Sequence, residues 1–167
     1  DCGGNALEGG VPVLFKGASV TPVYDPLPLQ INKLRQKVEA GAAYNQTQGD
    51  FDEESLLRFL EAVDCAGIQV PIMAGTIPLK SAGMARFMNE NVPGIAVPEE
   101  MIARLDAAAA EGRERGVKGL PAKLGIEMAA EFIAGIRDKK LCPGVHIMAI
   151  GAERNVPVIL EKAGVAL

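Results

Sequence analysis

The stretch AAYNQTQGDFDEESLLRFLEAVDCAGIQVPIMAG, residues 42–75, indicates the fold, because a strand, a helix and a second strand follow one another in it. Asp50 or Asp52 suits the cap of the helix, and Gly67 suits its end. The apolar residues that repeat on one face of this helix are Leu56, Leu57, Leu60 and Val63. The next stretch, residues 68–75, is apolar and predicts a buried strand. A strand–helix–strand unit of this kind is typical of a parallel α/β protein.

The first of these strands, predicted over residues 43–48, ends in a run of uncharged polar side chains. Such groups cost free energy when they are buried without partners. They are tolerable at the carboxyl end of a strand, where a parallel α/β protein meets its ligands. Gln48 is therefore a candidate ligand contact. The alternative is that its amide only caps the helix that begins a few residues later.

The rest of the chain repeats the pattern. Strands are predicted at 11–20, 43–48, 68–75 and 144–150, and helices at 28–41, 50–67, 81–89, 98–111, 120–138 and 154–164. This order predicts parallel strands with helices outside and right-handed crossovers. Two closures fit, an open doubly wound sheet or part of a (βα)8 TIM barrel. A complete barrel needs about 250 residues, so four βα units in 167 residues predict half of one.

Composition narrows the function classes. Apolar residues make up 49% of the chain, but aromatics only 4%, so the core must be aliphatic. The net charge of −4 and the absence of a basic stripe argue against nucleic-acid binding. Three widely spaced cysteines do not form a disulfide framework, which favours a cytoplasmic location. No apolar run is long enough to span a membrane, and residues 1–10 are polar and glycine-rich, as in a loop.

Several residues are interpreted as structural. His146 is the only histidine, and its place in the apolar strand GVHIMAI predicts a satisfied core side chain. Cys142 lies four residues earlier, but two such residues do not make a metal site, so no metal is expected. Asp50 and Asp52 are interpreted as helix caps rather than as a catalytic pair.

Four phrases, taken together and in this order, resemble the methylenetetrahydrofolate reductase family. They are LRQKVEAGAAYNQTQGDFD (34–52), AGIQVPIMAGTIPLKSAGMARFMNENVPGIAVPEEMIARLD (66–106), GIEMAAEFIAGI (125–136) and PGVHIMAIGAERNVPVILEKAGV (143–165). The phrases are most similar to bacterial variants, some of which are coupled to homocysteine or corrinoid methyl transfer. The resemblance implies a flavin enzyme on a (βα)8 barrel. It implies that residues 11–167 are the C-terminal half of that barrel and that residues 1–10 are a loop continuing from an N-terminal half.

The resemblance also implies site residues. Gln48 matches the glutamine of the family's TQ motif, which binds the folate pterin, and an amide offers both a donor and an acceptor for that task. Lys37 matches a lysine that approaches the FAD diphosphate, although a solvated helix face explains it equally well. Ala18 matches a small residue that contacts the cofactor. Asp25 falls near a flavin-contacting histidine of other members.

The sequence departs from the family pattern where the family contacts its substrate and its nicotinamide. Met88 stands in place of an aromatic residue and is therefore a candidate substrate contact, although methionines at helical spacing are more typical of packing. Met84 replaces a glutamine, and Gly151 and Ala152 replace an Asn-Arg pair. These changes leave the electron donor open between NADH, NADPH and a partner subunit.

The function implied is FAD-dependent reduction of 5,10-methylenetetrahydrofolate to 5-methyltetrahydrofolate, with an acid supplied by the N-terminal half. A non-catalytic half-barrel that serves as a binding or scaffold subunit is the alternative, and a generic phosphate-binding α/β module is a third. The seam of a half-barrel exposes strand edges, which predicts a homo-oligomer or a redox or methyl-transfer partner subunit.

Overall fold

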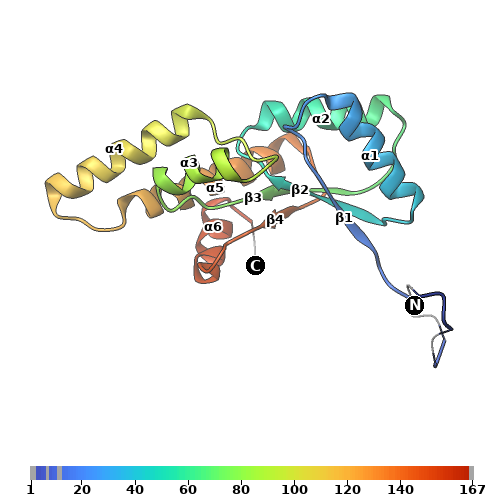
Figure 1. The fold of residues 1–167 in the computed structure, drawn as a ribbon. Helices are drawn as coiled ribbons and strands as arrows, with labels where there is room; N and C mark the ends of the chain where they lie inside the picture. The colour runs from blue at the N-terminus through green and yellow to red at the C-terminus, as the bar shows by residue number, and fades with distance from the viewer. Residues whose placement is uncertain (1–2, 7, 11–12, 166–167) are drawn as a thin grey trace.

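The sheet consists of four parallel strands in the order β1-β2-β3-β4 (Figure 1). A computed structural model describes residues 3–6, 8–10 and 13–165. The strands are β1 Gly17–Val20, β2 Tyr44–Gly49, β3 Ile72–Thr76 and β4 Val145–Ile147. Each strand pairs with the next one along the chain, as consecutive strands of a barrel do, whereas a doubly wound sheet reverses its order at a switch point. Of the two predicted closures, the half-barrel is confirmed.

One helix follows each of β1, β2 and β4, and three helices lie between β3 and β4. The helices are α1 Leu27–Glu39, α2 Glu53–Cys65, α3 Ala82–Asn91, α4 Glu99–Arg115, α5 Leu120–Lys139 and α6 Val156–Lys162, the last preceded by the 3-10 turn Glu153–Asn155. Helices α1 and α2 contact one another, and α4 packs against α3 and α5 (Figure 1). The α4 ribbon extends beyond the end of the sheet.

The core lies between the helices and one face of the sheet. Val20 and Ile72 of this face pack with Leu34 of α1 and Phe59 of α2. Because successive strand residues point to opposite faces, the other face carries the alternate positions. Those positions are exposed or half-buried except for buried Gly75: they are Gly17, Ser19, Tyr44, Gln46, Met73 and His146. The helices therefore cover only one face of the sheet.

Strands β1, β3 and β4 are shorter than the sequence predicted, whereas β2 keeps its predicted length and is displaced by one residue. Residues 11–12 of the predicted first strand lie outside the described residues, and residues 13–16 are not in a strand. Strand β2 begins at Tyr44, opposite Gly17, so no β2 residue lies in register with the residues before Gly17. Strand β3 begins at Ile72 rather than at residue 68. Strand β4 ends at Ile147 rather than at residue 150, and Ile150 has a φ of 46°, which is not extended.

The predicted apolar face of α2 is wrong at Leu57. Leu57 is 39% exposed, whereas Leu56 and Phe59 are fully buried. One residue turns a helix by about 100°, which carries Leu57 away from the face shared by Leu56 and Phe59. Leu29 of the predicted 28–41 helix is 42% exposed, and Leu34 takes the core position.

Helix α4 runs past the predicted end at Glu111. Gly112 lies inside the helix, and its backbone is close to the next segment: a Cβ there would lie 2.7 Å from the carbonyl oxygen of Val117. Gly116 ends the helix with a φ of 66°, a conformation that glycine adopts without steric cost. The observed end therefore depends on Gly116 rather than on Gly112.

A glycine-to-alanine pair tests how closely α5 approaches the segment after β3. A Cβ at Gly125 would lie 1.7 Å from the backbone oxygen of Leu79. We expect Gly125→Ala to reduce the free energy of unfolding by about 3 kcal/mol or more, because backbone must move. Gly83→Ala in α3 is the control. Its new Cβ meets nothing closer than 3.8 Å, so helix propensity should raise stability by up to about 1 kcal/mol. Urea unfolding of both variants measures the difference, and equal effects would contradict the contact.

Candidate functional site

The carboxyl end of β2 contains a bulge that is held by a side chain. The register between β2 and β3 runs from Gln46 opposite Met73 to Gly49 opposite Gly75, which leaves one extra residue on β2. Inside this stretch, the Thr47 hydroxyl accepts a hydrogen bond from the Gly75 amide at 2.7 Å. Thr47 is only 3% exposed. A buried hydroxyl thus takes the place of a backbone acceptor in the ladder.

Gly75 has no room for a side chain at this bulge. A Cβ there would lie 2.6 Å from the carbonyl oxygens of both Thr47 and Gln48. The Gly75 carbonyl in turn accepts a hydrogen bond from the Asp50 amide at 2.8 Å. Both backbone groups of Gly75 are therefore bound by residues of the bulge and its exit.

Asp50 is a buried carboxylic acid next to this bulge. It is 2% exposed, and its Oδ2 contacts the Thr47 hydroxyl in a hydrogen bond. Burial raises the pKa of Asp50 to about 7, and the nearby charge of Asp52 adds to the rise, while the hydrogen bond from Thr47 opposes it. Asp50 therefore changes charge near neutral pH.

The two aspartates of this segment have different roles, which corrects the interpretation of both as helix caps. Asp52 is the N-cap of α2: its carboxylate accepts from the amides of Glu54 and Ser55 at 3.2 and 3.0 Å. Burial raises the pKa of Asp52. These hydrogen bonds and one from the Ser55 hydroxyl together lower the pKa by more than burial raises it, so it lies below its usual value. Asp50 makes no capping bond to α2. Asp50 and Asp52 are only two residues apart, but only Asp52 lies where its carboxylate can cap α2.

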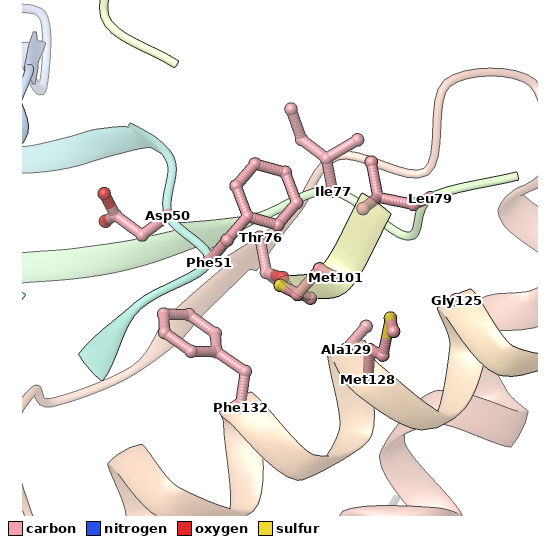
Figure 2. Close-up of a pocket in the computed structure, with 10 residues that line it drawn as sticks. All are labelled: Asp50, Phe51, Thr76, Ile77, Leu79, Met101, Gly125, Met128, Ala129 and Phe132. Carbon is pink, nitrogen blue, oxygen red and sulfur yellow. The ribbon is translucent and has the colours of Figure 1, made fainter. Parts of the chain in front are cut away.

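Asp50 lines a small apolar pocket between the sheet and α5. Figure 2 shows Phe51 and Ile77 on the sheet side and Phe132 of α5 on the other. The cavity measures about 10 Å³, which is room for about one water molecule. Its walls are mostly carbon, and Asp50 lies at its edge with the carboxylate turned away from Phe51 and Phe132 (Figure 2).

Gln48 lies at the bulge, at the end of β2, and it is half-buried. Its backbone oxygen is 2.9 Å from the Thr47 hydroxyl. The other amides of the polar run differ from it. Gln46 is half-buried on the side of the sheet without helices, whereas Asn45 is fully buried with neither side-chain atom in a hydrogen bond. The run therefore contains one amide that is enclosed and two that are accessible.

The predicted cofactor residues lie around β1. Ala18 is half-buried within the strand, and the Lys37 ammonium donates to the Ser19 carbonyl at 2.5 Å. This bond places the cation of α1 over the strand's carboxyl half, rather than out on a freely solvated face. Asp25 is exposed in the loop between β1 and α1. The structure brings Lys37 and β1 together, whereas no side-chain hydrogen bond or ion pair joins Asp25 to them.

Met88 is 7% exposed and packs with Ile95 and Val97 in a core cluster that Met84 also contacts. Its substrate contact stays a prediction. His146 corrects the expectation of a core histidine: it is half-buried and lies on the face of the sheet that the helices leave open, opposite Gly75. Gly151 is exposed and Ala152 is half-buried.

Sequence reasoning missed the role of Thr47 and the burial of Asp50. A threonine three residues before an aspartate at the end of a strand could have indicated a hydroxyl–carboxylate pair. The bulge that brings them together has no signal in the sequence of β2, because it arises from the register with β3.

Three further features bear on function: possible metal ligands and membrane-spanning helices among the described residues, and the state of one cysteine. No three side chains of His, Cys, Asp or Glu gather there as ligands of a metal ion. Cys142 is half-buried, and burial together with the charge of Asp50 raises the pKa of its thiol to about 11. None of the helices in this part of the chain has the length and apolarity needed to cross a bilayer.

The buried acid predicts a pH-dependent stability. Because folding raises the Asp50 pKa, the folded state binds its proton more tightly, and this contribution is lost as pH rises through about 7. Relative to Asp50→Asn, wild-type stability should therefore fall by up to about 4 kcal/mol between about pH 4 and about pH 8. Asp52→Asn is the control, because the lowered pKa of Asp52 stabilises the fold at higher pH and its contribution is lost on acidification. Urea unfolding at several pH values measures both, and a pH-independent difference for Asp50→Asn would contradict the buried ionisation.

Comparison with known proteins places this site in a family. The family model described as methylenetetrahydrofolate reductase matches residues 19–164. Similar curated proteins include Methylenetetrahydrofolate reductase 2 of Schizosaccharomyces pombe, 29% identical over 95% of this chain and 23% of the relative. Methylenetetrahydrofolate reductase 2 of Saccharomyces cerevisiae is 26% identical over 82% of this chain and 22% of the relative.

A rice protein, Probable methylenetetrahydrofolate reductase (NADH) of Oryza sativa subsp. japonica, is 29% identical over 78% of this chain and 21% of its own length. The chain thus spans less than a quarter of the curated relatives that it matches. The family model covers both the bulge and the helices around it, in agreement with the resemblance of the four phrases. This chain belongs to the methylenetetrahydrofolate reductase family.

Proposed function

We propose that this chain forms part of an active site that reduces 5,10-methylenetetrahydrofolate to 5-methyltetrahydrofolate with FAD. The observation that carries the proposal is the family match over residues 19–164, which includes the amide-bearing end of β2. Parallel α/β proteins bind ligands at this end of their strands. The chain spans less than a quarter of its curated relatives, so other segments of an intact enzyme would supply the remaining groups.

Gln48 is the residue that we propose for the folate. It is half-buried, so its amide is accessible while its backbone is held by the bulge. A planar amide presents a donor and an acceptor side by side, which suits the hydrogen-bonding edge of a pterin. It does so without a charge that would favour or oppose the movement of a hydride.

Lys37 and Ala18 are the residues that we propose for FAD, with Asp25 as a weaker candidate in the adjoining loop. The fit rests on two features of β1. The Lys37 cation is fixed over the strand by its 2.5 Å bond to Ser19, where it would attract a diphosphate. Ala18 and Ser19 carry small side chains, whereas the Tyr44 ring fills the space at Gly17. When bound, the flavin would supply the hydride, and the protein would orient it.

The edges of the sheet support the proposal that an N-terminal half completes a barrel. Strands β1 and β4 each have one strand neighbour among the described residues. Apolar side chains precede β1: Leu14 is 69% exposed and Phe15 is 80% exposed, with its ring stacked on Tyr44 at 5.4 Å. Exposed edges and apolar side chains of this kind are normally covered by further strands, by a second copy or by a partner subunit.

The electron donor is proposed as NADH or NADPH. The rice relative carries NADH in its name. Met88, at the place of the family's aromatic, contributes to the core, so its surroundings favour packing as the first role of this side chain. A partner subunit that delivers electrons is the competing source.

Gln48→Ala tests the folate site, with Gln46→Ala as the matched control on the same strand. In the intact protein we expect Gln48→Ala to lower kcat/KM for methylenetetrahydrofolate about tenfold or more, because a hydrogen bond to the pterin is lost. Gln46→Ala should change it less than threefold, roughly the scatter of a surface change. Steady-state kinetics with each donor measures both. Wild-type protein with neither flavin absorbance nor reductase activity would favour a non-catalytic binding subunit.

Lys37→Met tests the cofactor site, with Lys33→Met on the exposed side of the same helix as its control. Loss of the cation should weaken FAD about tenfold in Lys37→Met and leave Lys33→Met close to wild type. Titration of the apoprotein with FAD, followed by flavin fluorescence, gives both dissociation constants. Equal affinities of the two variants would show that Lys37 serves only to bind β1.

A further inference from the structure

The Thr47 hydroxyl has one proton and two acceptors within reach. It already accepts a hydrogen bond from the Gly75 amide at 2.7 Å. Its own proton can go to the Gln48 carbonyl, 2.9 Å away, or to Oδ2 of Asp50. A hydroxyl donates only one hydrogen bond at a time. The two acceptors therefore compete, and the charge of Asp50 decides the competition.

Each protonation state of Asp50 fixes one arrangement. An ionised Asp50 can only accept, so it takes the Thr47 proton and the Gln48 carbonyl loses that donor. A protonated Asp50 donates its own hydrogen to the second lone pair of Thr47, and Thr47 then donates to Gln48. Ionisation releases the Asp50 proton to solvent and reverses the direction of the Thr47–Asp50 hydrogen bond.

The surroundings of Asp50 leave Thr47 as its main partner. No ion pair among the described residues includes Asp50. Two titratable groups interact with Asp50 electrostatically. The charge of Asp52 opposes the ionisation of Asp50, and the charge of Asp50 raises the pKa of the Cys142 thiol before β4. The pocket beside Asp50 is lined by the uncharged side chains of Met101 of α4, Phe132 of α5 and Thr76 of β3.

The bulge links this switch to Gln48. Regular alternation would set the direction of a strand side chain, but the extra residue between Gln46 and Gly49 breaks it. The direction of Gln48 therefore depends on how its peptide is held. Of the side-chain donors in this network, only the Thr47 hydroxyl reaches the Gln48 carbonyl.

We propose that Asp50 is a positioning residue, which acts through Thr47 to hold the Gln48 peptide in its binding orientation when its carboxyl is protonated. The role in folate binding rests on the function proposed above, whereas the hydrogen-bond switch does not. The raised pKa of about 7 supports a switch within the neutral range. Asp50→Asn should lock the bound arrangement, because its amide donates to Thr47 at every pH.

The first test follows the hydrogen bonds directly. In the intact protein labelled with 15N-glycine and 15N-glutamine, the Gly75 backbone amide and the Gln48 side-chain amide should both titrate near pH 7. Asp50→Asn should abolish both titrations. Thr47→Ser, which keeps the hydroxyl, should preserve them, and Thr47→Val should remove them. Asp52→Asn is the matched control: the titrations persist, with a lower midpoint, because one opposing charge is gone. Titrations that persist in Asp50→Asn would overturn the switch.

The second test asks whether the switch reaches the folate. KM for methylenetetrahydrofolate should rise about fivefold in wild type between about pH 6 and about pH 8, since misorientation weakens binding. Asp50→Asn should keep the low value throughout. An unchanged rise in Asp50→Asn would overturn the positioning role while leaving the reductase function intact. Absence of folate reduction in wild type would overturn the proposed function, and the Gln48 amide titration would then decide the switch alone.

Discussion

Thr47 is the residue on which the centre of this sheet depends. Strand β2 lies between β1 and β3, so its pairing fixes the relative position of both neighbours. At its carboxyl end the ladder to β3 is interrupted, and the Thr47 hydroxyl supplies the acceptor that the Gly75 amide needs. A buried amide without an acceptor would cost about 1–3 kcal/mol. The same hydroxyl reaches Asp50, which joins the strand to the start of the loop before α2.

Glycine at position 75 is the other half of this arrangement. The carbonyl oxygens of Thr47 and Gln48 approach the position that a Cβ would take, so only glycine permits the close approach of β2 and β3. The bulge therefore requires one specific residue on each strand: a residue with a hydroxyl on β2 and a glycine on β3. Bulges of this type commonly lie beside functional sites because they redirect a side chain.

The buried carboxyl of Asp50 destabilises the fold when it is ionised. Its proposed role is to position Gln48 through Thr47. It is only 2% exposed, and Thr47 is the partner that favours its charge. A less polar residue would avoid the cost of burying a charge. The proposed switch gives the buried carboxyl a role at the end of β2. Ionisation of Asp50 would then both lower the stability of the fold and change the orientation of Gln48.

The open face of the sheet corresponds to the interior of a closed barrel. Helices cover the side that carries Val20 and Ile72, while the alternate positions, including His146, remain accessible. In a closed barrel such positions line the interior, so a side chain that is half-exposed here would become enclosed once further strands are added. This explains why His146, in an apolar strand, is not a core residue of the described fold.

The sequence by itself determined the element types, their order and the parallel α/β class, because apolar periodicity and turn residues are local signals. The resemblance of four phrases determined the family and directed attention to Gln48. The element pattern fitted both a half-barrel and a doubly wound sheet, and chain length and the resemblance favoured the half-barrel. The strand order of the tertiary structure confirmed it, since strand order depends on pairing between distant segments. Only the tertiary structure separated Asp50 from Asp52, two residues apart in one loop: Asp52 reaches the amides of α2, whereas Asp50 is buried and bound to Thr47 of β2 and Gly75 of β3. Burial of that kind comes from segments that are remote in the chain, and no local pattern contains it.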